Sequence, residues 1–135
     1  IIREFTNAAR KDLREDCPLI AVTYPPQQRP NYPFAAMSQN FDAMVLMDYW
    51  HTKNRAYSDA EVTEFIKQSV AVLKKAGCKV PIEVALQGCD IGAGMIAPSE
   101  IEAAVKAAND LGIGSSIYTY VTTPEVWDAY VNSDN

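Results

Sequence analysis

The sequence predicts an α/β fold of four consecutive strand–helix units with parallel strands. Four short, mostly apolar segments alternate with longer segments of helical periodicity along the 135 residues. Segments that are both short and apolar are typical of strands buried on both faces. Strands that alternate with helices form a parallel sheet, because each helix carries the chain back to the starting edge. We therefore expect residues 1–135 to form a single α/β domain.

The first part of the chain is expected to hold a helix, a strand and a proline-rich loop. Apolar residues recur at helical spacing over residues 1–16, and a proline follows soon after. Residues 19–24 are the first apolar segment, which we interpret as a buried strand that ends at a proline pair. Residues 25–33 contain four prolines and are expected to be a loop, before a short helix over residues 34–40.

The second unit has the clearest helix boundaries. Residues 43–50 predict another buried strand. Ser58 precedes a helical segment and is followed three residues later by Glu61, which is the pattern of a capping box. The helix should continue to residue 75 or 76, where Gly77 ends it.

The third unit repeats this order. Residues 81–87 predict a strand, and the glycine-rich residues 88–98 predict a loop. Ser99 and Glu102 have the capping-box spacing, so a second capped helix is expected to run to Leu111, just before a glycine.

The fourth unit completes the pattern and shows where function is expected. Residues 115–122 predict a strand, and Pro124 fits the first turn of a last helix that extends through Tyr130. The strand-to-helix loops are longer and richer in polar and aromatic residues than the helix-to-strand loops. Such loops place function at the carboxyl ends of the strands, in open sheets and in barrels.

Alternation within the strands favours half of a (β/α)8 barrel over an open four-stranded parallel α/β sheet, which is the alternative. Glu83, Ala85 and Gln87 share one face of the third strand, and apolar residues occupy the other. A strand covered by helices on both faces has little room for Glu83, whereas a barrel interior admits polar side chains in layers. Tyr118 and Tyr120 share a face near the end of the fourth strand, which suits a barrel mouth.

Several stretches resemble the C-terminal half of glycoside hydrolase-like (β/α)8 barrels, also called TIM barrels. Residues 41–50 resemble a late strand of such barrels, where an apolar strand often ends in Asp, Tyr or Trp at the sugar site. Residues 81–87, 98–101 and 114–120 resemble their last two strands. The resemblance covers nearly the whole chain and implies hydrolysis of glycosidic bonds by two carboxylates. It assigns no Asp/Glu pair of this chain as acid and nucleophile.

Two carboxylates are the candidate catalytic residues. Asp48 ends a buried strand beside aromatic residues, and a partly buried carboxylate can be tuned for either role in glycoside hydrolysis. Its alternative is a structural role, accepting backbone N–H bonds at the strand end. Glu83 lies near the middle of its strand and could be an acid with a raised pKa. Its alternative is an ion pair with a Lys or Arg in the barrel interior.

Aromatic and polar residues near the strand ends are the candidate carbohydrate contacts. Aromatic faces stack on the apolar faces of sugar rings, although they also fill protein cores. Amide, imidazole and carboxylate groups could bond sugar hydroxyls, although each could equally bond a neighbouring loop. The candidates are Tyr24, Tyr49, Trp50, His51, Gln87, Asp90, Tyr118 and Tyr120.

Composition argues against several classes of partner and cofactor. The formal net charge of −5 argues against binding to nucleic acid or to an anionic membrane surface. No segment approaches the roughly 18 continuous apolar residues of a membrane span. One His and three Cys without metal-site spacing predict no metal site, and we expect no cofactor. A single His and no nucleophile-elbow motif leave no support for a Ser or Cys triad.

The leading hypothesis is therefore part of a carbohydrate-active, glycoside hydrolase-like domain. A non-catalytic carbohydrate-binding or structural barrel is the alternative. Four strand–helix units leave two open sheet edges, which natural proteins avoid exposing. We expect the missing half-barrel, or a second copy of the same chain related by twofold symmetry, to cover them.

Overall fold

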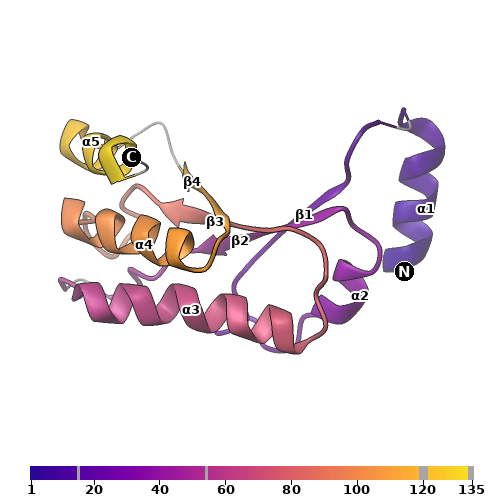
Figure 1. The fold of residues 1–135 in the computed structure, drawn as a ribbon, viewed down its shortest axis with the longest axis horizontal. Helices are drawn as coiled ribbons and strands as arrows, with labels where there is room; N and C mark the ends of the chain where they lie inside the picture. Colours follow the sequence, from indigo (N-terminus) through magenta and orange to yellow (C-terminus); the bar gives the residue numbers. More distant parts are fainter. Residues whose placement is uncertain (15, 54, 119–121, 134–135) are drawn as a thin grey trace.

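The computed structural model describes residues 1–14, 16–53, 55–118 and 122–133. Within them, one sheet of four parallel strands has the order β1-β2-β3-β4, so that strands adjacent in sequence are adjacent in space. A doubly wound open sheet instead reverses its strand order at a switch point. The sequential order, with helices on one face of the sheet, is that of half of a (β/α)8 barrel, which confirms the predicted fold class (Figure 1).

Helices and strands alternate along the described residues as predicted, with ends that differ by a few residues. The elements are α1 (Ile2–Asp12), β1 (Ile20–Thr23), α2 (Phe34–Ser38), β2 (Ala43–Asp48), α3 (Asp59–Lys75), β3 (Ile82–Gln87), α4 (Pro98–Asp110), β4 (Gly114–Tyr118) and α5 (Pro124–Ser133). Every helix within the described ranges is too short or too polar to cross a membrane.

One of the two predicted capping boxes is confirmed and the other is wrong. Ser58 caps α3: its hydroxyl accepts from the Glu61 N–H at 3.3 Å, and the Glu61 carboxylate accepts from the Ser58 N–H at 2.9 Å. In α4 the N-cap is Ala97, without a side-chain cap, and Pro98 takes the first helical position. Ser99 therefore lies inside the first turn, where it cannot cap the helix.

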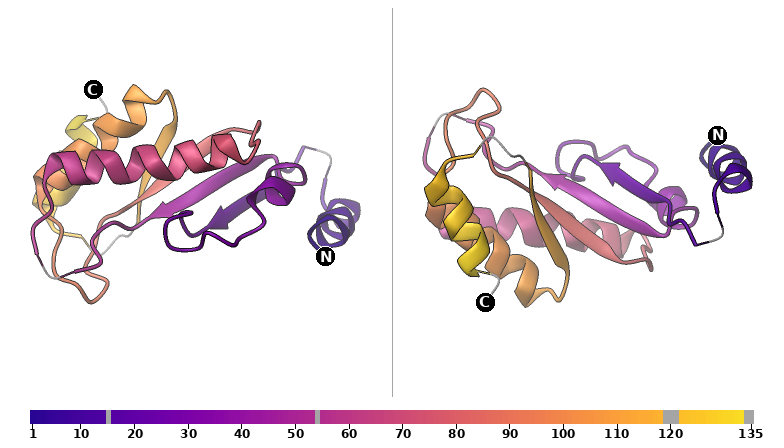
Figure 2. Two further views of the ribbon diagram at one scale, coloured as in Figure 1. Left: turned by 90° about the horizontal axis from the view of Figure 1, so that it is seen from below. Right: turned by 90° about the horizontal axis from the view of Figure 1, so that it is seen from above.

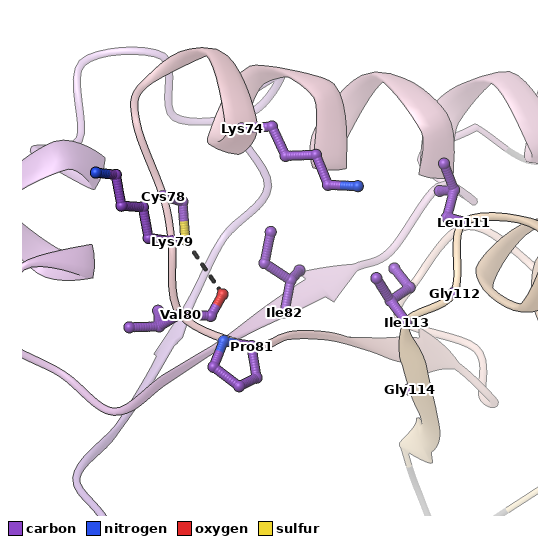
Figure 3. A pocket seen from close by; sticks show the side chains of 10 residues that line it. All are labelled: Lys74, Cys78, Lys79, Val80, Pro81, Ile82, Leu111, Gly112, Ile113 and Gly114. Atoms are coloured by element: carbon purple, nitrogen blue, oxygen red, sulfur yellow. Dashed lines mark hydrogen bonds between the residues drawn. The ribbon is translucent and has the colours of Figure 1, made fainter.

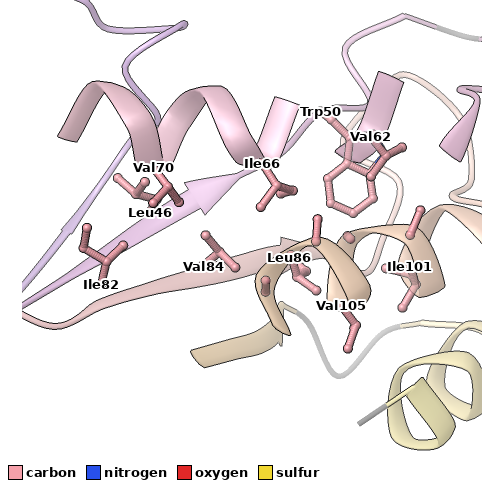
Figure 4. Close-up of a cluster of buried hydrophobic side chains, with 14 of the residues drawn as sticks. Leu46, Trp50, Val62, Ile66, Val70, Ile82, Val84, Leu86, Ile101 and Val105 are labelled. Carbon is pink, nitrogen blue, oxygen red and sulfur yellow. The ribbon is translucent and has the colours of Figure 1, made fainter. Parts of the chain in front are cut away.

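The core lies between the sheet and the helices on one of its faces. Figure 2 shows α3 and α4 along that face, and Figure 4 shows the side chains that meet there. Leu46 of β2 and Leu86 of β3 are fully buried, as are Ile66 of α3 and Ile101 of α4. Since these four residues come from four elements, the core holds β2 and β3 against both long helices.

The opposite face of the sheet, which we call the open face, has no helix of the described chain over it (Figure 2). Its central row runs across all four strands in register through Val22, Val45, Glu83 and Gly114. Val22 is 60% exposed and Ile20, on the same face, 49%. In a closed barrel this face would line the interior, which explains why most of its side chains are apolar.

The first helix, α1, lies beside α2 and away from α3, α4 and α5 (Figure 1). Arg10 of α1 donates to Asp42 at 2.8 Å, and Asp42 also accepts from the Leu19 N–H at 2.7 Å. These two contacts lower the pKa of Asp42, the Leu19 bond more than the Arg10 bond. They attach α1 and the start of β1 to the residue that precedes β2.

Candidate functional site

Tyrosines follow or end three of the four strands at the carboxyl edge of the sheet. Tyr24 follows β1, Tyr49 follows β2 and Tyr118 is the last residue of β4. We call this edge the mouth and these residues the mouth tyrosines. Tyr49 and Tyr118 stack with ring centroids 5.8 Å apart and an interplanar angle of 26°. Tyr118 is 56% exposed, so its ring is available to a ligand, whereas Tyr120 lies outside the described residues.

The phenol groups of the mouth lie close enough to influence one another. Burial, together with the smaller effects of the neighbouring Tyr118, Cys89 and Tyr24, raises the pKa of Tyr49 to about 12. The Tyr49 hydroxyl therefore stays protonated at physiological pH, when it can both donate and accept a hydrogen bond.

The proline-rich loop is attached to the mouth. The Arg29 guanidinium lies 5.0 Å from the centroid of the Tyr24 ring, which is a cation–π contact. Gln28 Nε2 donates to the Tyr49 carbonyl at 2.9 Å, and Gln27 Nε2 donates to the Phe65 carbonyl of α3 at 2.8 Å. The loop after β1 is thereby held against the loop after β2.

Asp48, the first candidate catalytic residue, lies on the helix face of the sheet and not on the open face. It is fully buried, and Ser69 Oγ of α3 donates to its Oδ2 at 2.5 Å. Its Oδ1 has no hydrogen-bond partner among the described residues. Burial raises the pKa of this carboxyl to about 8, and the Ser69 hydrogen bond offsets only part of that effect. The group is therefore protonated at neutral pH and is screened from the mouth by the sheet.

Glu83, the second candidate, lies on the open face as the alternation predicts. It is half-buried and pairs in register with Val45 on one side and Gly114 on the other. A Cβ added at Gly114 would lie 3.5 Å from Glu83 Cγ, an ordinary van der Waals contact, so the two residues are direct neighbours on this face. Within the described residues no Lys or Arg forms a salt bridge with Glu83. Its carboxylate is thus available to a group that approaches the open face.

Asp90 organises the loop after β3. Its Oδ1 accepts from the backbone N–H groups of Gly92 at 2.6 Å and of Ala93 and Gly94 at 3.0 Å. These bonds, led by the one from Gly92, lower the pKa of Asp90. The carboxylate is exposed and ionised, and one of its oxygens is engaged by the loop.

Trp50, His51 and Gln87 are brought together in a buried polar network instead of on the mouth surface. Trp50 Nε1 donates to Glu100 Oε2 of α4 at 2.7 Å. The His51 N–H donates to Gln87 Oε1 at 3.1 Å, and Gln87 Nε2 donates to the Cys89 carbonyl at 3.0 Å. Each of these three candidate residues is at most 2% exposed.

Glu100 is the residue of this network that the sequence reasoning missed. It is 1% exposed and shares the buried stripe of α4 with Ala104 and Ala108, four and eight residues later. The sequence did hold an indication of its burial, because Glu100 has the helical spacing of the alanines that form the buried stripe. Buried carboxylates need partners, so such a position predicts a polar contact across the helix interface.

The described residues hold an open hollow away from the mouth, but no group of metal ligands. No group of three His, Cys, Asp or Glu side chains gathers there in a way that could hold a metal ion, and the three cysteines are free. An open hollow of about 420 Å³ lies at the amino ends of β3 and β4, lined in part by Lys74, Ile82 and Ile113 (Figure 3). It is at the opposite end of the strands from the mouth, at the end where barrels are stabilised and not where they act.

The comparisons with known proteins agree with the fold. No family model and no curated protein matches this chain. The structure of the PgaB (BpsB) glycoside hydrolase domain from Bordetella bronchiseptica has a TM-score of 0.58 at 14% identity, over 98% of this chain and 40% of that one. Bee venom hyaluronidase also has a TM-score of 0.58 at 14% identity, over 86% of this chain and 43% of its own. The chain thus has part of a glycoside hydrolase-like fold and spans less than half the length of either structure.

Proposed function

We propose that this chain forms one half of a carbohydrate-active, glycoside hydrolase-like barrel and that the mouth tyrosines bind the sugar. The observation that carries this proposal is the stack of Tyr49 and Tyr118 at the carboxyl edge, with Tyr118 56% exposed. An aromatic ring with a free face and a hydroxyl at its edge suits a sugar ring, which is apolar on its face and polar at its rim. Ligands of parallel α/β folds bind at this edge.

If the barrel hydrolyses a glycosidic bond, Glu83 is the carboxylate of this half that takes part. It is half-buried on the open face, whereas Asp48 is enclosed beneath α3 with a pKa of about 8. Both retaining and inverting hydrolysis use two carboxylates on either side of the bond. The second carboxylate would come from the residues that complete the barrel, since Glu83 is the only carboxylate that the described strands place on the open face.

A non-catalytic carbohydrate-binding barrel is the second candidate. The observation that favours it is the same solitary Glu83, which lacks a carboxylate partner on the described open face. The two candidates differ in turnover and not in binding. Replacing Glu83 with Gln in the full-length protein should abolish hydrolysis and preserve sugar binding if the first candidate holds. A wild-type protein that binds sugar without cleaving it would favour the second.

Sugar binding is tested by calorimetry with a panel of neutral, amino and acidic oligosaccharides. Tyr118→Ala should weaken binding about 5-fold, since one ring contact contributes about 1 kcal/mol. Tyr24→Ala should also weaken binding. Tyr32→Ala is its matched control, because both tyrosines are 39% exposed, whereas Tyr32 lies outside the mouth and packs on Phe34 of α2. Unchanged affinity in Tyr118→Ala, or no binding of any member of the panel by the wild type, would contradict the proposal.

The same open face also supports a partner for this half-barrel. Val22 is 60% exposed there, and β1 and β4 each have one unpaired edge among the described strands. We propose that the missing half-barrel, or a second copy of this chain, covers the face and pairs with both edges. The native mass distinguishes them: twice the chain mass supports the second copy, and a single-copy mass supports a complementary half.

A further inference from the structure

We propose that Glu100 is a positioning residue for the mouth, acting through Trp50 and His51 on Tyr49 and Gln87. This inference rests on the proposed sugar-binding role of the mouth. Glu100 belongs to the first turn of α4, and the segment that it holds directly follows β2. The side chain thus joins the helix that covers the sheet to the loop that shapes its carboxyl edge.

Among the described residues, every polar contact of the Glu100 carboxylate involves the loop after β2. Oε2 accepts from Trp50 Nε1 at 2.7 Å, and Oε1 accepts a long bond from the Tyr57 N–H at 3.4 Å. Oε1 also lies 3.9 Å from His51 Nε2. A carboxylate that is 1% exposed needs hydrogen-bond donors, and the positive end of the α4 dipole further stabilises its negative charge. The loop supplies those donors, so its conformation and the burial of Glu100 depend on each other.

His51 extends this connection to the end of β3. Its backbone N–H donates to Gln87 Oε1, and Gln87 Nε2 donates onward to the Cys89 carbonyl. His51 Nδ1 is buried without a hydrogen-bond partner among the described residues. The imidazole is therefore oriented by packing against the Tyr57 ring, 5.1 Å between centroids, and by Glu100 on its Nε2 side.

The geometry of Tyr49 follows from the anchoring of its neighbour. Trp50 is 2% exposed, with its indole directed toward α4, whereas the preceding Tyr49 stacks on Tyr118 at the mouth. The two residues are adjacent in the chain, and their side chains are held on opposite sides, one by Tyr118 and the other by Glu100. Fixing the indole on one side consequently fixes the phenol on the other, and loss of the Glu100 bond should loosen both.

The experiment follows the indole and the tyrosine stack by NMR in the ligand-free, full-length protein. Trp127→Phe leaves Trp50 as the one indole of this chain, which contains two Trp. In that background Glu100→Ala should shift the Trp50 Nε1–H resonance toward that of an unbonded indole and remove the contact between the Tyr49 and Tyr118 rings. Sugar affinity should fall by the same factor as in Tyr49→Ala.

Glu100→Gln is the conservative variant that separates positioning from loss of folding. Its amide oxygen can still accept from Trp50 Nε1, and its NH₂ group gives up only the long bond from the Tyr57 N–H, so it should restore both the indole resonance and the ring contact. Glu102→Ala, on the exposed face of the same helix, is the matched control and should change neither. If Glu100→Ala does not fold, Glu100→Gln and the wild type are compared with Trp50→Phe by the Tyr49–Tyr118 ring contact alone, since Trp50→Phe has no indole resonance to follow.

A Tyr49–Tyr118 contact that survives in both Glu100→Ala and Trp50→Phe would overturn the positioning role, whatever the sugar affinity. Failure of the proposed function looks different: the ring contact would depend on Glu100 as described, yet the wild type would bind no oligosaccharide.

Discussion

Ser69 Oγ of α3 donates to Asp48 Oδ2 at 2.5 Å, which places the last side chain of β2 beneath a helix and away from the mouth. This contact separates Asp48 from Tyr49, its neighbour in sequence, because the two side chains lie on opposite faces of the sheet. It also makes Asp48 a protonated, neutral group at pH 7, since burial raises its pKa to about 8.

Asp48→Asn should change the pH dependence of stability. The carboxyl has an ordinary pKa of 3.8 and a pKa of about 8 in the fold, so the folded state holds a proton that the unfolded state releases. Wild-type stability from this group is complete below pH 3.8 and is lost as the pH rises to about 8. Asn cannot ionise, so Asp48→Asn lacks this loss. Its free energy of unfolding relative to the wild type should therefore rise by on the order of 3 kcal/mol from pH 5 to pH 8.

Urea unfolding at pH 5 and pH 8 measures this difference. Asp128→Asn, an exposed change on α5, is the control and should follow the wild type at both pH values. A constant free-energy difference between wild type and Asp48→Asn over this range would show that Asp48 ionises normally in the fold.

The two serines at capping-box spacing should respond differently to alanine. Ser58→Ala removes the cap of α3 and should lower the free energy of unfolding by about 1 kcal/mol. Ser99→Ala lies inside the first turn of α4, where no side-chain cap exists, and should change stability by less than about 0.5 kcal/mol. Thermal unfolding of both variants compares them, and equal losses would contradict the assigned start of α4.

Gly88→Ala should disturb the junction of β3 and β4 at the mouth. An added Cβ would lie 2.6 Å from Ile117 Cγ1 and 3.0 Å from the Tyr118 carbonyl, so the Ile117 side chain or β4 itself must move. We expect a loss of about 1–3 kcal/mol, as for other overpacked sites. Ile117→Ala in the same chain should relieve part of that loss, and a double-mutant cycle measures the coupling. Additive effects would contradict a direct clash.

Val22→Asp tests whether a second copy covers the open face. The change places a charge among exposed apolar residues, so a chain that closes by pairing with itself should become monomeric in native mass measurements. Val72→Asp is the matched control, because Val72 is exposed on the outer side of α3 and should leave the mass unchanged. A wild type that is already monomeric excludes the second copy.

The face of Glu83 could be predicted from sequence, whereas the face of Asp48 could not. In β3 the polar and small residues alternate with Ile82, Val84 and Leu86, so the helix face is evident from a period of two. In β2 both faces are apolar up to Asp48, and nothing in the alternation distinguishes them. Only the packing of α3 against β2 decides which side the aspartate takes.

Local chemistry was sufficient for the order of the elements and for the capping box at Ser58, because helix and strand periods and the reach of a serine hydroxyl act within a few residues. The sequence by itself thus determined four strand–helix units and the open-face position of Glu83. The tertiary structure alone decided that Trp50 lies buried on Glu100, fifty residues away, and that Tyr49 stacks on Tyr118. Those contacts join elements distant in the chain, and their geometry follows from how whole helices and strands pack.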